Sequence, residues 1–288
     1  MLGPLLLFTC ALLWGTAFVA QKEVVGRLGP FAIIFSRSIL AAAFLFVWTR
    51  LAKGGGFTRK AAFGGALSGI ALFFAILAQQ LGIEKTTPGI AAFLTTNYLL
   101  IVPVLGVFLG RKTHRSVWFA VALALVGTYF ICMPPGEDFR MGSGEALELL
   151  CALLFALQIL VVDRFARDLD VVAFSCVQML VCGLLAIPFF ALGSETAHFN
   201  LPDITSAALP VLYLGLISSG VAYTFQNLGQ VRTSPALAAV LMSLESVFGA
   251  LSGYLYYGDV LTVMQFTGCA LVFGSAVFVS VTPYLKKR

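Results

Sequence analysis

QQLGIEKTTP at residues 79–88 is repeated as QNLGQVRTSP at residues 226–235, an offset of 147 residues (226 minus 79). The same register places Gly106 on Gly253 and Gly127 on Gly274. An earlier pair, CALLW at residues 10–14 and CALLF at residues 151–155, matches at an offset of 141 (151 minus 10). The chain is therefore built from two related halves, an arrangement typical of membrane transporters whose two bundles enclose a central site.

The composition points to lipid as the main solvent. The chain has 288 residues, of which 60% are hydrophobic and 11% charged, and its mean hydropathy is +0.97. Soluble domains carry about 25% charged residues. Apolar runs of about 20 residues, enough to span a hydrocarbon core about 30 Å thick, recur along the sequence without period-two alternation. We expect an all-α integral membrane protein with ten transmembrane helices, at about 2–20, 30–51, 61–82, 88–110, 117–133, 143–162, 171–193, 207–230, 236–257 and 261–281.

A proline-rich linker divides the ten spans into two sets of five. Met-Pro-Pro-Gly-Glu-Asp at residues 133–138 continues neither neighbouring helix. We therefore expect a first repeat at 1–133, a linker at 134–142 and a second repeat with a short basic tail at 143–288. Because each repeat has an odd number of spans, the second enters the membrane from the opposite side and the repeats are inverted.

The basic residues predict the orientation of the chain. With a cytoplasmic N-terminus, four basic residues lie on the outer side: Lys22, Arg27, Lys85 and Arg140. Thirteen lie on the cytoplasmic side: Arg50, Lys53, Arg59, Lys60, Arg111, Lys112, Arg115, Arg164, Arg167, Arg232, Lys286, Lys287 and Arg288. This positive-inside pattern predicts a multi-pass protein of the cytoplasmic (inner) membrane with both termini cytoplasmic. It also explains the net charge of +5 without nucleic acid as a partner.

Two repeated helix starts set the depth of the residues that follow them. In Thr87-Pro88 and Ser234-Pro235 the hydroxyl caps exposed amides, and proline at the first helical position loses no hydrogen bond. Ten residues later, at about 1.5 Å per residue, the chain is about 15 Å into a core about 30 Å thick. The residues at that depth are Tyr98 and Glu245. Pro103, five residues after Tyr98, is expected to bend its helix.

Glu245 is the sharpest candidate for a functional group. A carboxyl group near the bilayer centre costs about 2.5–3.5 kcal/mol on insertion scales, so it is expected to face a cavity or a partner. It either binds a cationic group of the substrate, takes up a proton that couples transport, or is a protonated, hydrogen-bonded side chain that locks its helix.

Two other charged residues lie inside predicted spans. Arg37 either holds a substrate carboxylate in a bidentate grip or serves the structure, by reaching the interface or pairing with a carboxylate or helix end. Glu148 lies one or two turns into its span, where we expect interfacial water to solvate it.

The remaining candidates are amides and aromatic rings. Symmetry brings Gln79 and Gln226 toward the pseudo-two-fold axis, either as cavity lining or as interhelical hydrogen bonds worth roughly 1 kcal/mol each. Residues beside the midplane positions are also expected to line the cavity: Thr95, Thr96, Asn97, Ser243 and Ser246. Trp14, Tyr98 and Tyr223 lie away from the interfacial belt and with Glu245 would form an amphipathic pocket or an aromatic cage for an ammonium group.

Other sequence features point to packing and not to chemistry. The cysteines occur in apolar segments without ligand-like spacing and are expected to be buried thiols: Cys10, Cys132, Cys151, Cys176, Cys182 and Cys269. No metal cluster, cofactor or nucleotide-binding motif is expected. Small-xxx-small spacings at Gly65/Gly69, Gly106/Gly110 and Gly249/Gly253 are expected to allow close helix packing.

The segment 244–262, LESVFGALSGYLYYGDVLT, resembles the ninth-helix signature of the EamA family in the drug/metabolite transporter superfamily. Asp259 stands where that pattern has Glu, and the first-half copy at 102–111 departs further, with Arg111 in place of an acid. Trp14-Gly15 also fits the family. The resemblance covers essentially the whole chain. It implies transport of small organic solutes, often export of amino acids or related metabolites, through a cavity between the halves, with helices five and ten at the periphery.

The leading hypothesis is a secondary transporter of small polar or amphipathic metabolites that works by alternating access, in the direction of export, with protons as a possible coupling ion. Uptake of an organic cation such as choline is the alternative within transport, and a lipid scramblase is the alternative from another class. An enzyme is disfavoured because clustered nucleophiles or an acid–base pair at one depth are lacking. Monomer and homodimer both remain open.

Overall fold

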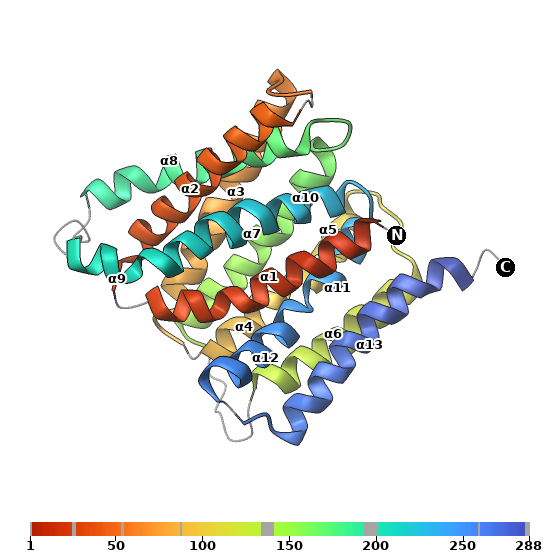
Figure 1. Ribbon diagram of the computed structural model, residues 1–288. Coiled ribbons are helices and arrows are strands. Elements are labelled where there is room, and N and C mark those ends of the chain that lie inside the picture. The colour runs from red at the N-terminus through yellow and green to blue at the C-terminus, as the bar shows by residue number, and fades with distance from the viewer. Residues whose placement is uncertain are drawn as a thin grey trace.

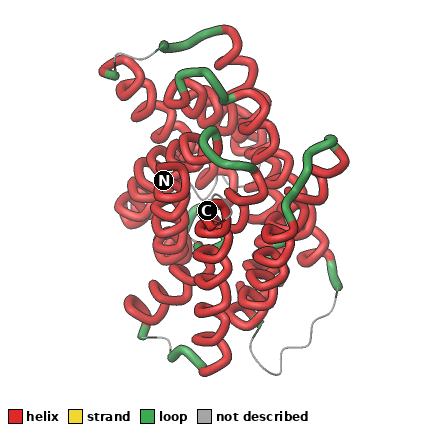
Figure 2. Tube along the Cα trace, turned by 90° about the vertical axis from the view of Figure 1, so that its right-hand side faces the viewer, coloured by secondary structure: helices red, strands yellow, loops and turns green. Residues whose placement is uncertain are grey.

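The computed structural model of the chain describes residues 2–24, 27–52, 55–86, 88–133, 141–192, 201–258 and 260–285. Several sequence predictions fall outside these ranges: the helix cap Thr87, linker residues 134–140, Asp259 and the basic tail 286–288. The regular elements of the described residues are helices (Figures 1 and 2).

The first half of the chain contains α1 (Leu2–Val24), α2 (Pro30–Leu51), α3 (Arg59–Ile83), α4 (Pro88–Thr96), α5 (Tyr98–Phe108) and α6 (Arg115–Cys132). The second half contains α7 (Ser143–Phe165), α8 (Val171–Leu192), α9 (Leu201–Leu212), the π-helix η2 (Tyr213–Ala222), α10 (Tyr223–Gln230), α11 (Pro235–Met242), α12 (Glu245–Tyr257) and α13 (Val263–Leu285). Several of these elements are consecutive pieces of a single span, namely α4 with α5, α9 with η2 and α10, and α11 with α12.

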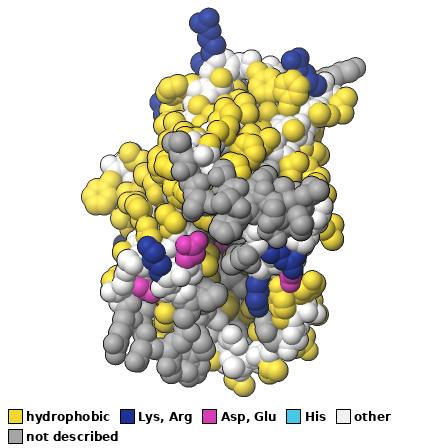
Figure 3. Space-filling model, turned by 90° about the vertical axis from the view of Figure 1, so that its left-hand side faces the viewer, with side chains coloured by type: hydrophobic (Ala, Val, Ile, Leu, Met, Phe, Trp, Pro, Cys, Tyr) yellow, Lys and Arg dark blue, Asp and Glu magenta, His cyan; other side chains and the backbone are white. Residues whose placement is uncertain are grey.

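Joined in this way, the described helices form ten spans long and apolar enough to cross a membrane. Each lies within a few residues of a span predicted from the sequence, from 2–24 for the first to 263–281 for the last. The fold class is therefore confirmed as an all-α membrane protein with two inverted five-helix repeats. Large apolar side chains on the outside fit this class, since Phe108, Leu255 and Val263 are at least 80% exposed. Figure 3 shows one face where hydrophobic side chains cover a broad area and charges gather at its edge and across its lower part.

Two spans are interrupted at equivalent places in the repeats. The fourth span breaks at Asn97, between α4 and α5, and the ninth at 243–244, between α11 and α12. Near each break a polar side chain donates a hydrogen bond to a backbone carbonyl. Asn97 Nδ2 donates to Phe93 O at 2.9 Å, and Ser243 Oγ donates to Val240 O at 2.7 Å. Inside a membrane such compensation is what makes an interrupted helix tolerable. The fourth span thus breaks at Asn97, whereas Pro103 lies inside α5.

The two halves pack against each other helix by helix. The closest partners include α1 with α12, α2 with α8 and α3 with α7, each pairing one helix from either half. Small residues permit these crossings, as predicted for Gly65 and Gly69. A Cβ at Gly69 would lie 2.5 Å from Gln178 O on α8. Gly249 likewise packs on α1, where an added Cβ would meet the Phe18 ring at 3.0 Å.

The prediction of close packing at Gly106 and Gly110 is wrong. An added Cβ at Gly106 would meet nothing nearer than Arg111, at 3.9 Å. Gly110 follows the end of α5 with φ of 76°, a left-handed conformation that glycine adopts without strain. Gly110 therefore follows the end of the helix, and neither glycine packs against a neighbouring helix.

The fifth and tenth spans lie together at one edge of the bundle. α6 and α13 run side by side in Figure 1, and an added Cβ at Gly127 of α6 would lie 2.7 Å from the Val272 side chain of α13. This position agrees with the peripheral place expected for helices five and ten. Both spans still contribute lining residues to the central cavity between the halves: Ile131 and Cys132 from α6 and Gln265 from α13.

Candidate functional site

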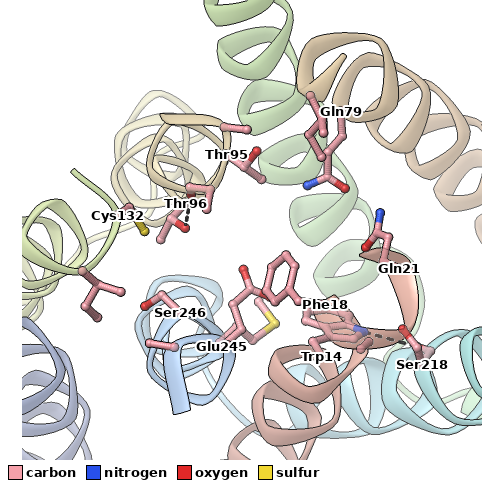
Figure 4. A pocket seen from close by; sticks show the side chains of 18 of the residues that line it. Trp14, Phe18, Gln21, Gln79, Thr95, Thr96, Cys132, Ser218, Glu245 and Ser246 are labelled. Atoms are coloured by element: carbon pink, nitrogen blue, oxygen red, sulfur yellow. Dashed lines mark hydrogen bonds between the residues drawn. The ribbon is translucent and has the colours of Figure 1, made fainter. Parts of the chain in front are cut away.

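A cavity of about 520 Å³ lies between the two halves. It extends from mid-depth, at Tyr98 and Glu245, to one end of the bundle, where Gln21 and the loop residues Val260 and Leu261 line it. Ten of the residues predicted from the sequence line this cavity: Trp14, Arg37, Gln79, Thr95, Thr96, Tyr98, Tyr223, Gln226, Glu245 and Ser246. Figure 4 shows Glu245 and Ser246 on α12 facing Thr95 and Thr96 on α4 across this space.

Tyr98 and Glu245 meet at the inner end of the cavity. The Tyr98 hydroxyl donates to Glu245 Oε1 at 3.2 Å. Each residue is the first of its helix, α5 or α12, directly after the break in its span. The breaks therefore position both side chains. Glu245 has no cationic partner within 4.0 Å among the described residues, which leaves its carboxyl group for a ligand, water or a proton.

Trp14 and Tyr223 form an aromatic wall of the cavity. Their ring centroids lie 4.8 Å apart at an interplanar angle of 61°, an edge-to-face contact. The indole Nε1 of Trp14 donates to Ser218 O at 3.2 Å, which fixes the orientation of the ring (Figure 4). The wall therefore presents two aromatic rings to the cavity, with the indole N–H of Trp14 already hydrogen-bonded.

Arg37 is buried on α2 and contacts the π-helix. Its Nε donates to Ser219 Oγ at 2.8 Å, and its Nη2 donates to Ser218 Oγ at 3.1 Å. No carboxylate lies within 4.0 Å of the guanidinium among the described residues. The side chain thus does not reach the interface or pair with an acid.

The repeated amides have divided roles. Gln226 lines the cavity, and its Nε2 also donates to Gln158 Oε1 on α7 at 3.1 Å. This residue therefore serves both as cavity lining and as an interhelical hydrogen bond. Gln79 lines the cavity near Gln21 (Figure 4). Its neighbour Gln80 accepts from Gln21 Nε2 at 2.8 Å. The cavity wall is therefore held in place by amide pairs between helices.

The placement of Asn97 and Ser243 in the cavity is wrong. Neither is among the lining residues. Asn97 Nδ2 donates to Phe93 O and Leu94 O, and Ser243 is fully buried with its hydroxyl on Val240 O. Carbonyls near a helix break need donors, and these two side chains supply them instead of facing the cavity.

The expectation for Glu148 is also wrong, because no interfacial water reaches its side chain. Glu148 is 0% exposed and accepts a hydrogen bond of 2.6 Å from Thr95 Oγ1. Its Oε1 has no partner among the described residues. Because α4 and α3 cover this turn of α7, a second carboxyl group lies just behind the cavity-lining Thr95.

Some cavity residues were not predicted from the sequence. Phe18, Gln21, Ile159 and Ser218 line the cavity without belonging to a repeated or midplane position. Phe155 also lines it, as the repeat equivalent of Trp14 in the CALLF segment. Gln21 lies seven residues after Trp14 on α1, hence on the same helix face, a spacing that identifies it as a candidate. The apolar residues Phe18 and Ile159 have no comparable spacing that would identify them from the sequence.

The opposite end of the bundle is bridged by an ion pair between the halves. Arg111, after α5, pairs with Asp163 on α7, which also pairs with Arg167 Nη2 at 2.6 Å. Arg167 also reaches Thr233 O, beside the start of α1: an added Cβ at Gly3 would lie 2.9 Å from Thr233. Asp163 is 3% exposed, whereas the two arginines are 37% and 48% exposed. A second cavity of about 440 Å³ adjoins this cluster.

A model of the EamA-like transporter family matches residues 1–133 and again residues 142–281. The chain belongs to the EamA-like transporter family. It is therefore a multi-pass membrane transporter of the drug/metabolite class, and its relatives are transporters and not enzymes.

Curated relatives of this EamA family member include an uncharacterized transporter of Archaeoglobus fulgidus, 29% identical over 94% of this chain and 83% of the relative. The threonine/homoserine exporter RhtA of Salmonella typhimurium is 26% identical over 72% of this chain and 68% of its own length. A solved crystal structure superimposes with a TM-score of 0.85 at 18% identity, covering 99% of both chains, which supports the fold alone.

The described residues of this EamA family member offer no group of three His, Cys, Asp or Glu side chains that would hold a metal ion. The six cysteines are free thiols, five of them buried and Cys269 half-buried, much as predicted. The cavity is lined by carboxyl, guanidinium, amide, hydroxyl, thiol and aromatic side chains.

Proposed function

We propose that this protein is a secondary transporter that moves small polar or amphipathic metabolites, amino acids and related compounds first, across the cytoplasmic membrane by alternating access. The observation that carries the proposal is the cavity between the two repeats, with the Tyr98–Glu245 contact at its inner end. A volume of about 520 Å³ lies within the usual range of ligand pockets. The RhtA relatives, which are named as threonine/homoserine exporters, support export of amino acids.

Differences between the two ends of the bundle support alternating access. The cavity reaches one end, at Val260 and Leu261, while the Arg111–Asp163–Arg167 cluster joins the halves at the other. Inverted repeats can exchange conformations, which would open the second end and close the first. With both termini cytoplasmic, as the basic residues predict, the cavity faces outward and the ion pairs form the cytoplasmic gate.

Transport can be tested with the purified protein in proteoliposomes. Vesicles preloaded with unlabelled threonine or homoserine should accumulate labelled threonine by counterflow, and excess unlabelled substrate should inhibit it. Vesicles without protein and vesicles preloaded with choline are the controls. Counterflow with choline and none with amino acids would favour the organic-cation alternative. Loss of lipid asymmetry without any solute flux would favour the scramblase alternative.

A further inference from the structure

Arg37 is a cation inside the membrane whose charge the described part of the chain does not balance. It is 7% exposed and lines the cavity. Its two hydrogen-bond partners, Ser218 and Ser219, are neutral hydroxyl groups. A guanidinium group carries five N–H donors, and these two contacts use two of them. Charged side chains within membrane spans pair with opposite charges or mark a substrate path.

Ser218 and Ser219, which contact the guanidinium, are consecutive residues of the π-helix η2. In a π-helix such as η2, each backbone hydrogen bond joins residues i and i+5, one residue further apart than in an α-helix. Such segments occur often at functional sites. Close packing against α2 brings the serines within reach. An added Cβ at Gly215 would lie 2.8 Å from Leu40, and one at Gly220 would lie 3.0 Å from the Phe44 ring. The wall that holds Arg37 is thus tightly built.

The opposite charge in this cavity belongs to Glu245. Tyr223 lines the same cavity as Arg37 and Glu245, and its ring packs on Trp14. The cavity therefore presents a cation, an apolar aromatic wall and a carboxyl group. These three groups complement a small solute that has a carboxylate for the cation, a short side chain for the aromatic wall and an ammonium group for the carboxyl group.

We propose that Arg37, held by Ser218 and Ser219, is the subsite that binds the carboxylate of a zwitterionic amino-acid substrate. This proposal rests on the proposed transport function and names its substrate class. The serines orient the guanidinium, whose remaining N–H donors grip both carboxylate oxygens. A substrate that lacks a carboxylate, such as an organic cation, would leave the charge of Arg37 unbalanced in the cavity.

The test compares ligands before it compares variants. Counterflow and thermal-shift binding are measured for threonine, for threonine amide, which lacks the carboxylate, and for N-acetylthreonine, which lacks the ammonium group. The wild-type protein should bind threonine at least tenfold more tightly than its amide. Equal affinity for acid and amide, with transport intact, would overturn the subsite and leave the transporter standing. Transport of no solute in a broad metabolite panel would overturn both.

Substitutions then assign the preference to Arg37. Arg37→Gln should remove the preference for threonine over the amide, and Arg37→Lys should retain part of it, since a lysine keeps the charge but not the bidentate geometry. Arg50→Gln, at the exposed end of the same helix, is the matched control and should behave as wild type. An unchanged preference in a folded Arg37→Gln protein would refute the assignment. If that variant does not fold, the preference measured with Arg37→Lys decides, and a wild-type value there would equally refute it.

Discussion

Tyr98 donates a hydrogen bond of 3.2 Å to Glu245, and the two residues are 147 positions apart, the same interval that separates the repeated sequences. Equivalent residues of two inverted repeats can touch only near the pseudo-two-fold axis that relates them. The contact therefore marks the position of the pseudo-two-fold axis. In one half the position holds a phenol and in the other a carboxyl group, so the symmetric fold carries an asymmetric site.

Replacing Glu245 tests its role in coupling. If Glu245 carries a proton across the membrane, Glu245→Gln should keep counterflow exchange of the substrate but lose stimulation by a pH gradient, because the amide does not exchange a proton. The measurement is substrate flux in proteoliposomes with and without an imposed gradient. Glu84→Gln, which removes an exposed carboxyl group at the end of α3, is the control. Full stimulation in Glu245→Gln would contradict the role.

Replacing Tyr98 tests the contact itself. Tyr98→Phe removes a hydrogen bond to a carboxyl group, worth about 1.5–3 kcal/mol when that group is charged, while keeping the ring. We expect substrate affinity to change by about tenfold and the thermal stability in detergent to change little. Wild-type affinity in Tyr98→Phe would show that the contact does not shape the binding site.

Asp163 tests the proposed gate. Asp163→Asn leaves Arg111 and Arg167 without their carboxylate and should destabilise the closed cytoplasmic end. A buried pair costs about 3–5 kcal/mol to break, and the half-exposed arginines reduce this to about 1–2 kcal/mol, or roughly a tenfold shift in population. The readout is labelling of Leu237→Cys in the second cavity by a thiol reagent from the cytoplasmic side. Asp168→Asn, at an exposed turn nearby, should leave labelling unchanged, and equal labelling in both variants would argue against a gate.

Asn97 separates structure from binding. Asn97→Ala removes the donor that serves the carbonyls of Phe93 and Leu94, so it should lower the free energy of unfolding by about 1–3 kcal/mol. Because Asn97 does not line the cavity, affinity for the substrate should stay within twofold of wild type. Thermal unfolding and ligand titration of the same preparation give both values. A large loss of substrate affinity in Asn97→Ala, with unchanged thermal stability, would instead indicate that Asn97 takes part in substrate binding.

Gly15 tests the packing of the halves. An added Cβ would lie 2.3 Å from Phe248 Cβ and 2.8 Å from Gly249 N, both on α12. Gly15→Ala should therefore destabilise the protein by about 1–3 kcal/mol, the usual cost of overpacking. Gly274→Ala, where nothing lies within 4 Å, is the matched control and should melt as wild type. Equal melting temperatures would mean that α1 and α12 do not meet this closely.

The fold was predictable because lipid imposes strong rules on sequence. Apolar runs define the spans, and the repeated QQLGIEKTTP and QNLGQVRTSP segments place Tyr98 and Glu245 at the same depth. The breaks at Asn97 and at 243–244 were not predicted, because short polar side chains within a span serve either a cavity or the backbone. The depth of Glu148 in its span led to the wrong prediction that water solvates its side chain. The side chain is buried by other helices, whose positions cannot be deduced from the sequence of its own span.

The most direct test of the central claim asks whether Glu245 faces water at mid-depth. In a Cys132→Ser background, which removes the thiol that lines the cavity, Glu245→Cys is treated in oriented vesicles with a membrane-impermeant, positively charged thiol reagent from the outer side. Leu100→Cys, two residues after Tyr98 on the exposed face of α5, is the lipid-facing control. We predict rapid modification of Glu245→Cys, slowed by substrate, and none of Leu100→Cys. An unreactive thiol at 245 would mean that no water-filled chamber reaches this residue, and the proposed mechanism would be wrong.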